Sequence, residues 1–225
     1  EFEIQSFVPE EYWTVESNLK NNAEESLHSR LVSLKGKKLD KLSLKSEADA
    51  IEAIRCIENS DLVVKNNEEK KEFRNPKPPF TTSTLQQEAS RKLNFSASRT
   101  MKAAQKLYEG LNIGSETTGL ITYMRTDSVQ LSKESVNEIR KKIVLDYGNK
   151  YCPEKLKVYK SKVANAQEAH EAIRPTSVTR KPKEIKSFLS EDCFKLYDLI
   201  WKRTVSSQMS SAILNKTIID IESAN

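Results

Sequence analysis

The chain has 225 residues, of which 37% are hydrophobic and 31% charged, and its net charge is +5. This length can hold one large or two ordinary domains with a sizeable core, and no apolar run approaches the ~20 residues of a membrane span. The start at Glu1 lacks the basic residues of a signal peptide, so we expect a cytoplasmic protein. Three scattered cysteines and two histidines argue against a disulfide framework or a zinc site.

The charge is unevenly distributed along the chain. Residues 1–80 carry 13 Lys and Arg against 16 Asp and Glu, residues 81–177 carry 16 against 10, and residues 178–225 carry 8 against 6. A basic middle segment attracts polyanions such as a nucleic-acid backbone. A solvated helical surface has the same composition, and charge alone does not separate the two interpretations.

The first 74 residues read as strands around one helix. Alternating patterns predict strands over residues 3–8, 12–19 and 29–34, the last followed by a turn at 35–37. Ser46 is typical of a helix cap, and helical spacing of apolar residues continues to about Glu58. Residues 62–73 return to a strand pattern. This stretch contains no constellation of catalytic residues.

Three prolines in the four positions 76–79 exclude a helix and remove strand donors, so we place a domain boundary at residue 80. Thr81 then caps a helix that should run to about Leu93. A second helix begins at Ser96 or Ser98 and ends near Gly110. Its predicted core face consists of Met101, Ala104, Leu107 and Tyr108.

The segment Gly119–Ser128 places a phenol, a guanidinium and a carboxylate at alternate positions: Tyr123, Arg125 and Asp127. Its β-branched and aromatic residues favour a strand over 120–126, in which these side chains share one face. A tyrosine nucleophile needs a nearby cation, and a guanidinium matches phosphate oxygens. The alternative is an edge strand with a polar outer face that ends in a turn, and spacing alone does not decide between them.

The remaining elements are mainly helical. We expect a helix from Ser132 to Tyr147, a basic loop over 151–162, a helix from Ser190 to about Met209 and a strand over 212–221. Between them lies a second polar cluster, residues 165–176, in which Pro175 should end any helix at about Ile173.

His170 is the histidine of this second cluster, and an imidazole can hydrogen-bond a phosphate or move a proton at neutral pH. A surface or capping histidine is the alternative. Position 174 is Arg where a zinc metalloprotease motif requires a second His, which excludes that class. The chain also has no Gly-x-x-x-x-Gly-Lys loop for ATP.

The run from Gly119 to Ser128 resembles the active-site strand of type IA DNA topoisomerases, and its part from Tyr123 to Ser128, with Met124, is similar to the bacterial members. Residues 80–89, 167–176 and 196–201 are also similar to family segments, in the family's order and spacing. Topoisomerase III relatives, which usually carry Pro at position 124 and His at position 171, fit less well. The resemblance covers essentially the whole chain.

This resemblance implies that Tyr123 attacks one DNA strand, forms a 5′-phosphotyrosyl link and later releases it, so that strand passage relaxes negative supercoils without ATP. By matching positions, Arg125 would bind and polarise the phosphate. Asp127 and His170 would shape the hydrogen-bond network around it. Glu171 and Arg174 are weaker candidates for DNA contact.

The resemblance further implies an α+β fold: a β-rich hinge domain (residues 1–80 with 208–225) and a mostly helical gate domain (81–207) that carries Tyr123. The family's Mg²⁺-binding Toprim domain is not represented, since no Asp-x-Asp occurs. We therefore expect a fragment with a truncated hinge sheet and no metal site, inactive alone in DNA relaxation.

The implied partners are single-stranded or negatively supercoiled DNA and the Toprim domain of the same polypeptide. The resemblance implies a monomer that works on the bacterial nucleoid and binds no membrane. A non-catalytic, basic nucleic-acid-binding module is the alternative function; it would give the Tyr123 run and the His170 cluster no special role.

Overall fold

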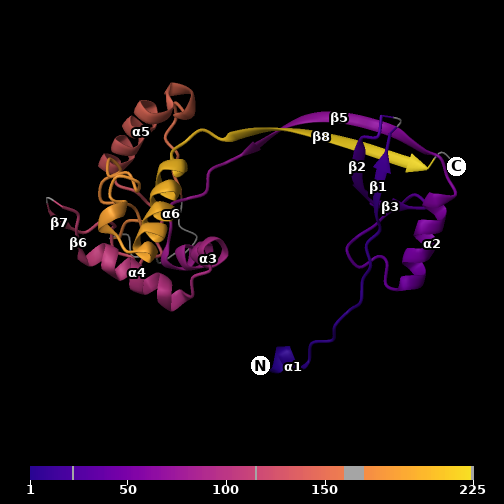
Figure 1. Cartoon of the computed structure of the whole chain (residues 1–225), viewed down its shortest axis with the longest axis horizontal. Coiled ribbons are helices and arrows are strands. Elements are labelled where there is room, and N and C mark those ends of the chain that lie inside the picture. The colour runs from indigo at the N-terminus through magenta and orange to yellow at the C-terminus, as the bar shows by residue number, and fades with distance from the viewer. Residues whose placement is uncertain (22, 115, 160–169, 224–225) are drawn as a thin grey trace. The chain divides into compact units, whose positions relative to one another are not determined.

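The chain forms two compact units in the computed structural model, which describes residues 1–21, 23–114, 116–159 and 170–223. Unit 1 comprises Glu1–Lys70 and the segment from Asn215 onward, and unit 2 comprises Lys71–Leu214. Helices and short sheets are mixed along the chain (Figure 1), which confirms the predicted α+β class. None of the helices in the described ranges is long and apolar enough to cross a membrane.

In its described part, unit 1 contains small antiparallel hairpins and two helices. β1 (Glu16–Lys20) pairs with β2 (Ser26–Arg30), and β3 (Ser33–Leu34) pairs with β4 (Lys37–Lys38). The strand predicted over 29–34 is therefore two strands. The helix predicted from Ser46 is confirmed as α2 (Glu47–Glu58), which has a capping box between Ser46 and Asp49.

The strand predicted over residues 3–8 is wrong. The structure has a short helix there, α1 (Phe2–Gln5), followed by irregular chain. Phe2, Ile4, Phe7 and Val8 are 73–82% exposed, so no neighbouring strand or core fixes this segment as a strand. The next predicted strand, residues 12–19, forms only from Glu16 onward.

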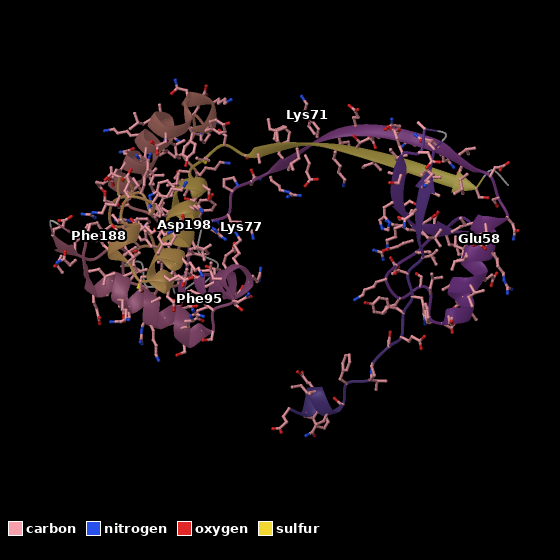
Figure 2. The ribbon with its side chains drawn as sticks, viewed as in Figure 1. Glu58, Lys71, Lys77, Phe95, Phe188 and Asp198 are labelled. Carbon is pink, nitrogen blue, oxygen red and sulfur yellow. The ribbon has the colours of Figure 1, made fainter. Side chains whose placement is uncertain are left out.

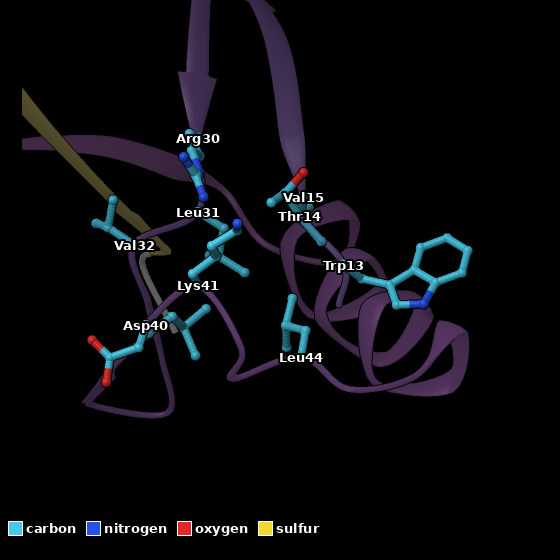
Figure 3. Close-up of a pocket in the computed structure, with 10 residues that line it drawn as sticks. Trp13, Thr14, Val15, Arg30, Leu31, Val32, Asp40, Lys41 and Leu44 are labelled. Atoms are coloured by element: carbon cyan, nitrogen blue, oxygen red, sulfur yellow. The ribbon is translucent and has the colours of Figure 1, made fainter. Parts of the chain in front are cut away.

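The core of unit 1 is small. Its buried members are Val15, Leu44, Ala50 and Ala53. A cavity of about 250 Å³ opens beside Val15 and Leu44, and Arg30, Asp40 and Lys41 also line it (Figure 3). The Trp13 indole points away from the other labelled side chains in that view. Apolar burial therefore gives this unit limited stabilisation.

The longest strands, β5 (Leu62–Arg74) and β8 (Ala212–Ser223), pair with each other alone, as a two-stranded ribbon. Both were predicted from sequence. Almost every residue of the two strands is exposed or half-buried, and Figure 2 shows side chains on both sides of the ribbon near Lys71. A two-stranded ribbon of this kind buries little apolar surface, so it is marginally stable by itself.

Unit 2 is mainly helical, and its helices begin and end at the predicted signals. Thr81, Ser96, Ser132 and Ser190 cap the helix N-termini, and each side chain accepts a backbone N–H of the first turn. Two short strands and two 3-10 turns were not predicted. The elements are α3 (Thr82–Leu93), α4 (Ala97–Glu109), β6 (Leu111–Asn112), β7 (Thr117–Thr118), α5 (Lys133–Tyr147), η1 (Asn149–Tyr151), η2 (Lys186–Phe188) and α6 (Glu191–Ser207).

One continuous core joins the four long helices of unit 2. Two of its aromatic side chains make hydrogen bonds: Tyr197 Oη donates to the Arg180 carbonyl, and Trp201 Nε1 donates to the Val178 carbonyl. The fully buried members include Phe80, Leu85, Leu107, Leu120, Ile139, Ile173, Leu196 and Ile200. Two of these, Leu120 and Ile173, lie on irregular segments that hold the candidate site.

The proline-rich segment 75–80 is packed against unit 2. Tyr159 Oη lies within hydrogen-bond distance of the Pro76 and Ser207 carbonyls, and Arg203 Nη1 donates to the Pro78 carbonyl. Phe80 is fully buried under the Arg203 guanidinium. The division between the units therefore falls at Lys70 and Leu214, inside β5 and β8, and the predicted boundaries at residues 80 and 207 lie within unit 2.

Candidate active site

The Gly119–Ser128 segment is not the strand predicted from its residues. It has a single isolated bridge, from Ile121 to Pro175, and bends at residues 122, 124 and 125. Its backbone groups bond instead to segments distant in sequence. Local propensity could not show this, because the competing partners are side-chain hydroxyls and caps from elsewhere in the fold.

Thr82, the first residue of α3, fixes the part of the segment that follows Tyr123. Its hydroxyl donates to the Met124 carbonyl at 2.8 Å and accepts from the Thr126 N–H at 2.9 Å. Its own N–H, which has no partner inside the helix, donates to the Thr126 carbonyl at 2.9 Å. The first residue of α3 thus supplies the backbone hydrogen bonds that a neighbouring strand would otherwise supply.

Thr122 fixes the part that precedes Tyr123. Its hydroxyl donates to the Ala172 carbonyl at 2.7 Å and accepts from the Arg174 N–H at 3.0 Å, while its N–H donates to the Arg174 carbonyl at 2.9 Å. Two threonines therefore hold the backbone on either side of Tyr123. The cluster that follows His170 supplies one of these attachments.

Gly119 allows the segment to start close against α4. A Cβ at this position would lie 2.6 Å from the Tyr108 carbonyl oxygen, a distance that only a displacement of backbone could relieve. The next residue, Leu120, donates its N–H to the Leu107 carbonyl at 2.7 Å. The glycine is thus required by close approach of two backbones.

The predicted alternation of side chains is present despite the irregular backbone. Tyr123 is 39% exposed, and Arg125 and Asp127 are also exposed. The residues between and after them are buried: Met124 at 2%, Thr126 at 7% and Ser128 at 7%. An extended chain directs successive side chains to opposite sides whether or not it pairs, so the three candidate residues all reach the surface.

The rings of Tyr123 and His170 lie together, with centroids 5.9 Å apart and planes at 36°. The structure thus brings together the two polar clusters that the sequence placed far apart. Residues 165–169 of the second cluster lie outside the described residues, as do residues 160–162 of the predicted basic loop. Residues 170–176 contain no helix, only bridges at Ile173 and Pro175.

Tyr108 is a neighbour of Tyr123 that was predicted to belong to the core. It is 41% exposed, and its ring meets Tyr123 edge to face, with centroids 5.4 Å apart at 63°. On a helical wheel Tyr108 lies about 80° from the centre of the buried face of α4, at the edge of the apolar stripe. Its position near the end of α4, shortly before the Tyr123 segment, was the sequence signal that could have placed it beside Tyr123.

Glu171 and Arg174 bond to each other and to the protein. Arg174 Nη2 donates to Glu171 Oε2 at 2.6 Å and Nη1 donates to the Pro175 carbonyl, while Glu171 Oε1 accepts the Ser132 N–H at 2.6 Å. Burial acts to raise the pKa of Glu171, but the hydrogen bonds from Arg174 and Ser132 outweigh it and the pKa lies below its ordinary value. These side chains link the His170 segment to the start of α5.

Arg125 and Asp127 have no hydrogen-bond or ion-pair partner among the described residues. An unpaired, exposed guanidinium two positions from a phenol is available to bind an anion. The described parts of the chain contain no group of three His, Cys, Asp or Glu side chains that could hold a metal ion. The exposed Arg125, two positions from the Tyr123 phenol, thus fits phosphate recognition.

Comparisons with known proteins identify the family. A family model described as DNA topoisomerase matches residues 1–225. The chain is 48% identical over 225 residues to DNA topoisomerase 1 of Rickettsia felis, and the match covers 100% of this chain and 29% of that protein. It is 47% identical over 229 residues to DNA topoisomerase 1 of Xylella fastidiosa, covering 28% of it.

A solved structure agrees with these matches. Full-length topoisomerase I from Thermotoga maritima superposes with a TM-score of 0.74 at 35% identity, over 99% of this chain and 33% of that one. The chain thus spans about a third or less of the length of these relatives. Both comparisons agree with the resemblance carried by Tyr123-Met124-Arg125-Thr126-Asp127-Ser128, and the chain belongs to the DNA topoisomerase family.

Proposed function

We propose that this chain supplies the nucleophile of a bacterial type IA DNA topoisomerase, an enzyme that opens one DNA strand, passes a strand through the break and reseals it. The contact of the Tyr123 and His170 rings at 5.9 Å is the observation that carries the proposal. It joins two clusters distant in sequence near Arg125, which is exposed and has no partner in the part of the chain that the structure describes. A simple backbone-binding module requires no such arrangement.

In the proposed reaction the Tyr123 phenol oxygen attacks the phosphorus of one phosphodiester. The bond from phosphorus to the 3′ oxygen breaks, the phenol gives up its proton, and the leaving oxygen takes one to become a 3′-hydroxyl. Resealing is the reverse, in which the 3′-hydroxyl attacks the 5′-phosphotyrosyl link. One phosphate ester replaces another in each step, so no ATP is consumed.

The side chains around Tyr123 have separate roles in this proposal. Arg125 binds the phosphate and stabilises the charge that develops on its oxygens, because a guanidinium matches them bidentately. His170 and Asp127 order the hydrogen bonds around the phenol and phosphate. Glu171 and Arg174 act through the backbone that carries His170, since both are bonded within the protein.

Magnesium belongs, in this proposal, to a Toprim domain of the longer polypeptide, where it supplies electrostatic stabilisation of the phosphate. The hinge domain that arches over the passing strand corresponds in this proposal to unit 1, and the gate that carries Tyr123 corresponds to unit 2. The protein acts as a monomer on single-stranded or negatively supercoiled DNA in the bacterial cytoplasm.

Replacing Tyr123 by Phe tests the proposal in the longer enzyme that contains this chain. We expect the covalent protein–DNA adduct to be lost while binding of a single-stranded oligonucleotide is kept, since only the nucleophilic oxygen is removed. Denaturing gel electrophoresis with labelled oligonucleotide measures the adduct, and a native gel shift with the same oligonucleotide measures binding. Tyr151→Phe, another exposed tyrosine of unit 2, is the matched control. An adduct that persists in Tyr123→Phe would identify another nucleophile.

The 225-residue chain alone should not relax supercoiled plasmid DNA, because it carries only part of the proposed site. An agarose-gel relaxation assay with Mg²⁺ present measures this directly. Relaxation by this chain alone would contradict the division of the site. Salt-sensitive DNA binding by the longer protein without any adduct would instead support the non-catalytic module.

A further inference from the structure

The orientation of the Tyr123 ring depends on few contacts. Thr122 and Thr82 fix the backbone on either side of it, but the phenol oxygen has no hydrogen bond to a described residue. The ring is 39% exposed, and its aromatic neighbours in the described structure are Tyr108 and His170. The backbone attachments place the residue, whereas these ring contacts must orient its side chain.

Tyr108 is better placed than His170 to impose that orientation. It comes from α4, a 13-residue helix whose buried face includes Ala104 and Leu107 at 0% exposure. His170 is exposed and lies on a segment that forms neither helix nor strand. The edge-to-face geometry, with centroids at 5.4 Å and planes at 63°, is the favoured arrangement of two aromatic rings.

We infer that Tyr108 is a positioning residue for the nucleophile: the contact with its ring holds the Tyr123 phenol in the orientation required for in-line attack on the phosphate. This inference rests on the proposed function. The aromatic ring of Tyr108, and not its hydroxyl, makes the contact with Tyr123. No hydrogen bond of the Tyr108 hydroxyl occurs among the described residues. A phenylalanine at position 108 should therefore replace it, and an alanine should not.

The kinetic experiment measures single-turnover formation of the covalent adduct in the longer enzyme. Tyr108→Ala should slow cleavage about three- to tenfold, the effect of losing one aromatic pair, with oligonucleotide affinity unchanged. Tyr108→Phe should restore the rate. Cleavage by Tyr108→Ala at the normal rate, or equal impairment in Tyr108→Phe, would overturn the inference.

The matched control is Tyr147→Ala. Tyr147 also meets a second tyrosine, Tyr151, edge to face at 63°, and its exposure of 43% is close to that of Tyr108. It ends α5, at the far end from Ser132, which is roughly 20 Å away by helix geometry. Tyr147→Ala should leave the cleavage rate unchanged. If it slowed cleavage as much as Tyr108→Ala does, the effect of Tyr108→Ala would be general destabilisation of the fold.

A second measurement keeps the inference testable if the enzyme forms no adduct at all. In NMR spectra of the labelled chain, the Tyr123 ring resonances, assigned with Tyr123→Phe, should move in Tyr108→Ala because the ring current of Tyr108 is lost. Tyr108→Phe should keep them in place. Tyr123 ring resonances that do not shift in Tyr108→Ala would refute the ring contact. Absence of an adduct in the unmodified enzyme would instead refute the proposed function.

Discussion

The Tyr123 segment and the β5–β8 ribbon show two opposite ways of fixing an extended chain. The ribbon has regular backbone pairing over its length, yet nearly all its side chains reach solvent. The Tyr123 segment has almost no regular pairing, yet Leu120 and Ile121 are buried and threonines tie its backbone on both sides of Tyr123. Regularity and rigidity are therefore separate properties in this chain.

The largest effect should come from Leu120→Ala, which tests whether the irregular segment is part of the core. Leu120 is fully buried, so its truncation should cost about 2–5 kcal/mol of unfolding free energy. Urea unfolding followed by Trp201 fluorescence, in a Trp13→Phe background, reports on unit 2 alone, because the chain has two tryptophans. A loss below about 1 kcal/mol would mean that the segment is only loosely attached.

Thr122→Val should have the next largest effect, because it removes the hydroxyl that replaces a strand partner. The change keeps the side-chain shape but leaves the Arg174 N–H and the Ala172 carbonyl without that partner, at a cost of about 1–3 kcal/mol. The same fluorescence measurement applies. Thr117→Val, at an exposed strand position, is the control and should be nearly neutral. Equal effects at both positions would refute the anchoring role.

Glu171→Gln should lower stability by a smaller amount, about 1 kcal/mol at pH 7, and should change its pH dependence. The pKa of Glu171 is lowered in the folded state, so its carboxylate stabilises the fold above the ordinary pKa of 4.5. This contribution is lost as the pH falls through the lower, folded-state value. Unfolding at pH 7 and pH 3 measures it: the difference between variant and parent should shrink in acid, and a constant difference would contradict the linkage.

The smallest effect should come from the ribbon. Val64 lies in β5 with 63% of its surface exposed, so Val64→Thr, which keeps the branched β-carbon, should change unfolding free energy by less than about 0.5 kcal/mol. Thermal unfolding of the whole chain measures it. A cost as large as that of Leu120→Ala would show that the regular ribbon is stabilised by packing after all.

The helices of unit 2 could be predicted from sequence because their signals are local. Thr81, Ser96, Ser132 and Ser190 each accept a bond from a residue three positions on, and the following apolar spacing is sufficient to mark the helix. The β5 and β8 strands were equally clear. Their pairing brings together residues far apart in sequence, such as Lys65 and Glu222, which are 157 positions apart, and no local pattern contains that information.

The candidate site was predictable in part for the same reason. Alternation along the chain correctly placed Tyr123, Arg125 and Asp127 at the surface, because that depends only on extended backbone. The attachments to Thr82 and Arg174 could not be predicted, since their partners are distant in sequence. Helical spacing assigned Tyr108 to the core. Its actual exposure depends on where the Tyr123 segment lies along α4, which the sequence does not show.

The attachments around Tyr123 also have a mechanical consequence. In the proposed reaction a DNA end is joined covalently to the phenol, and any tension in the DNA acts on this one residue. Thr122 passes such a load to the 172–174 segment, Thr82 passes it to α3, and Leu120 passes it to the end of α4. A pull on the DNA would therefore be shared among three parts of unit 2, and the break could stay open without tearing its attachment point from the fold.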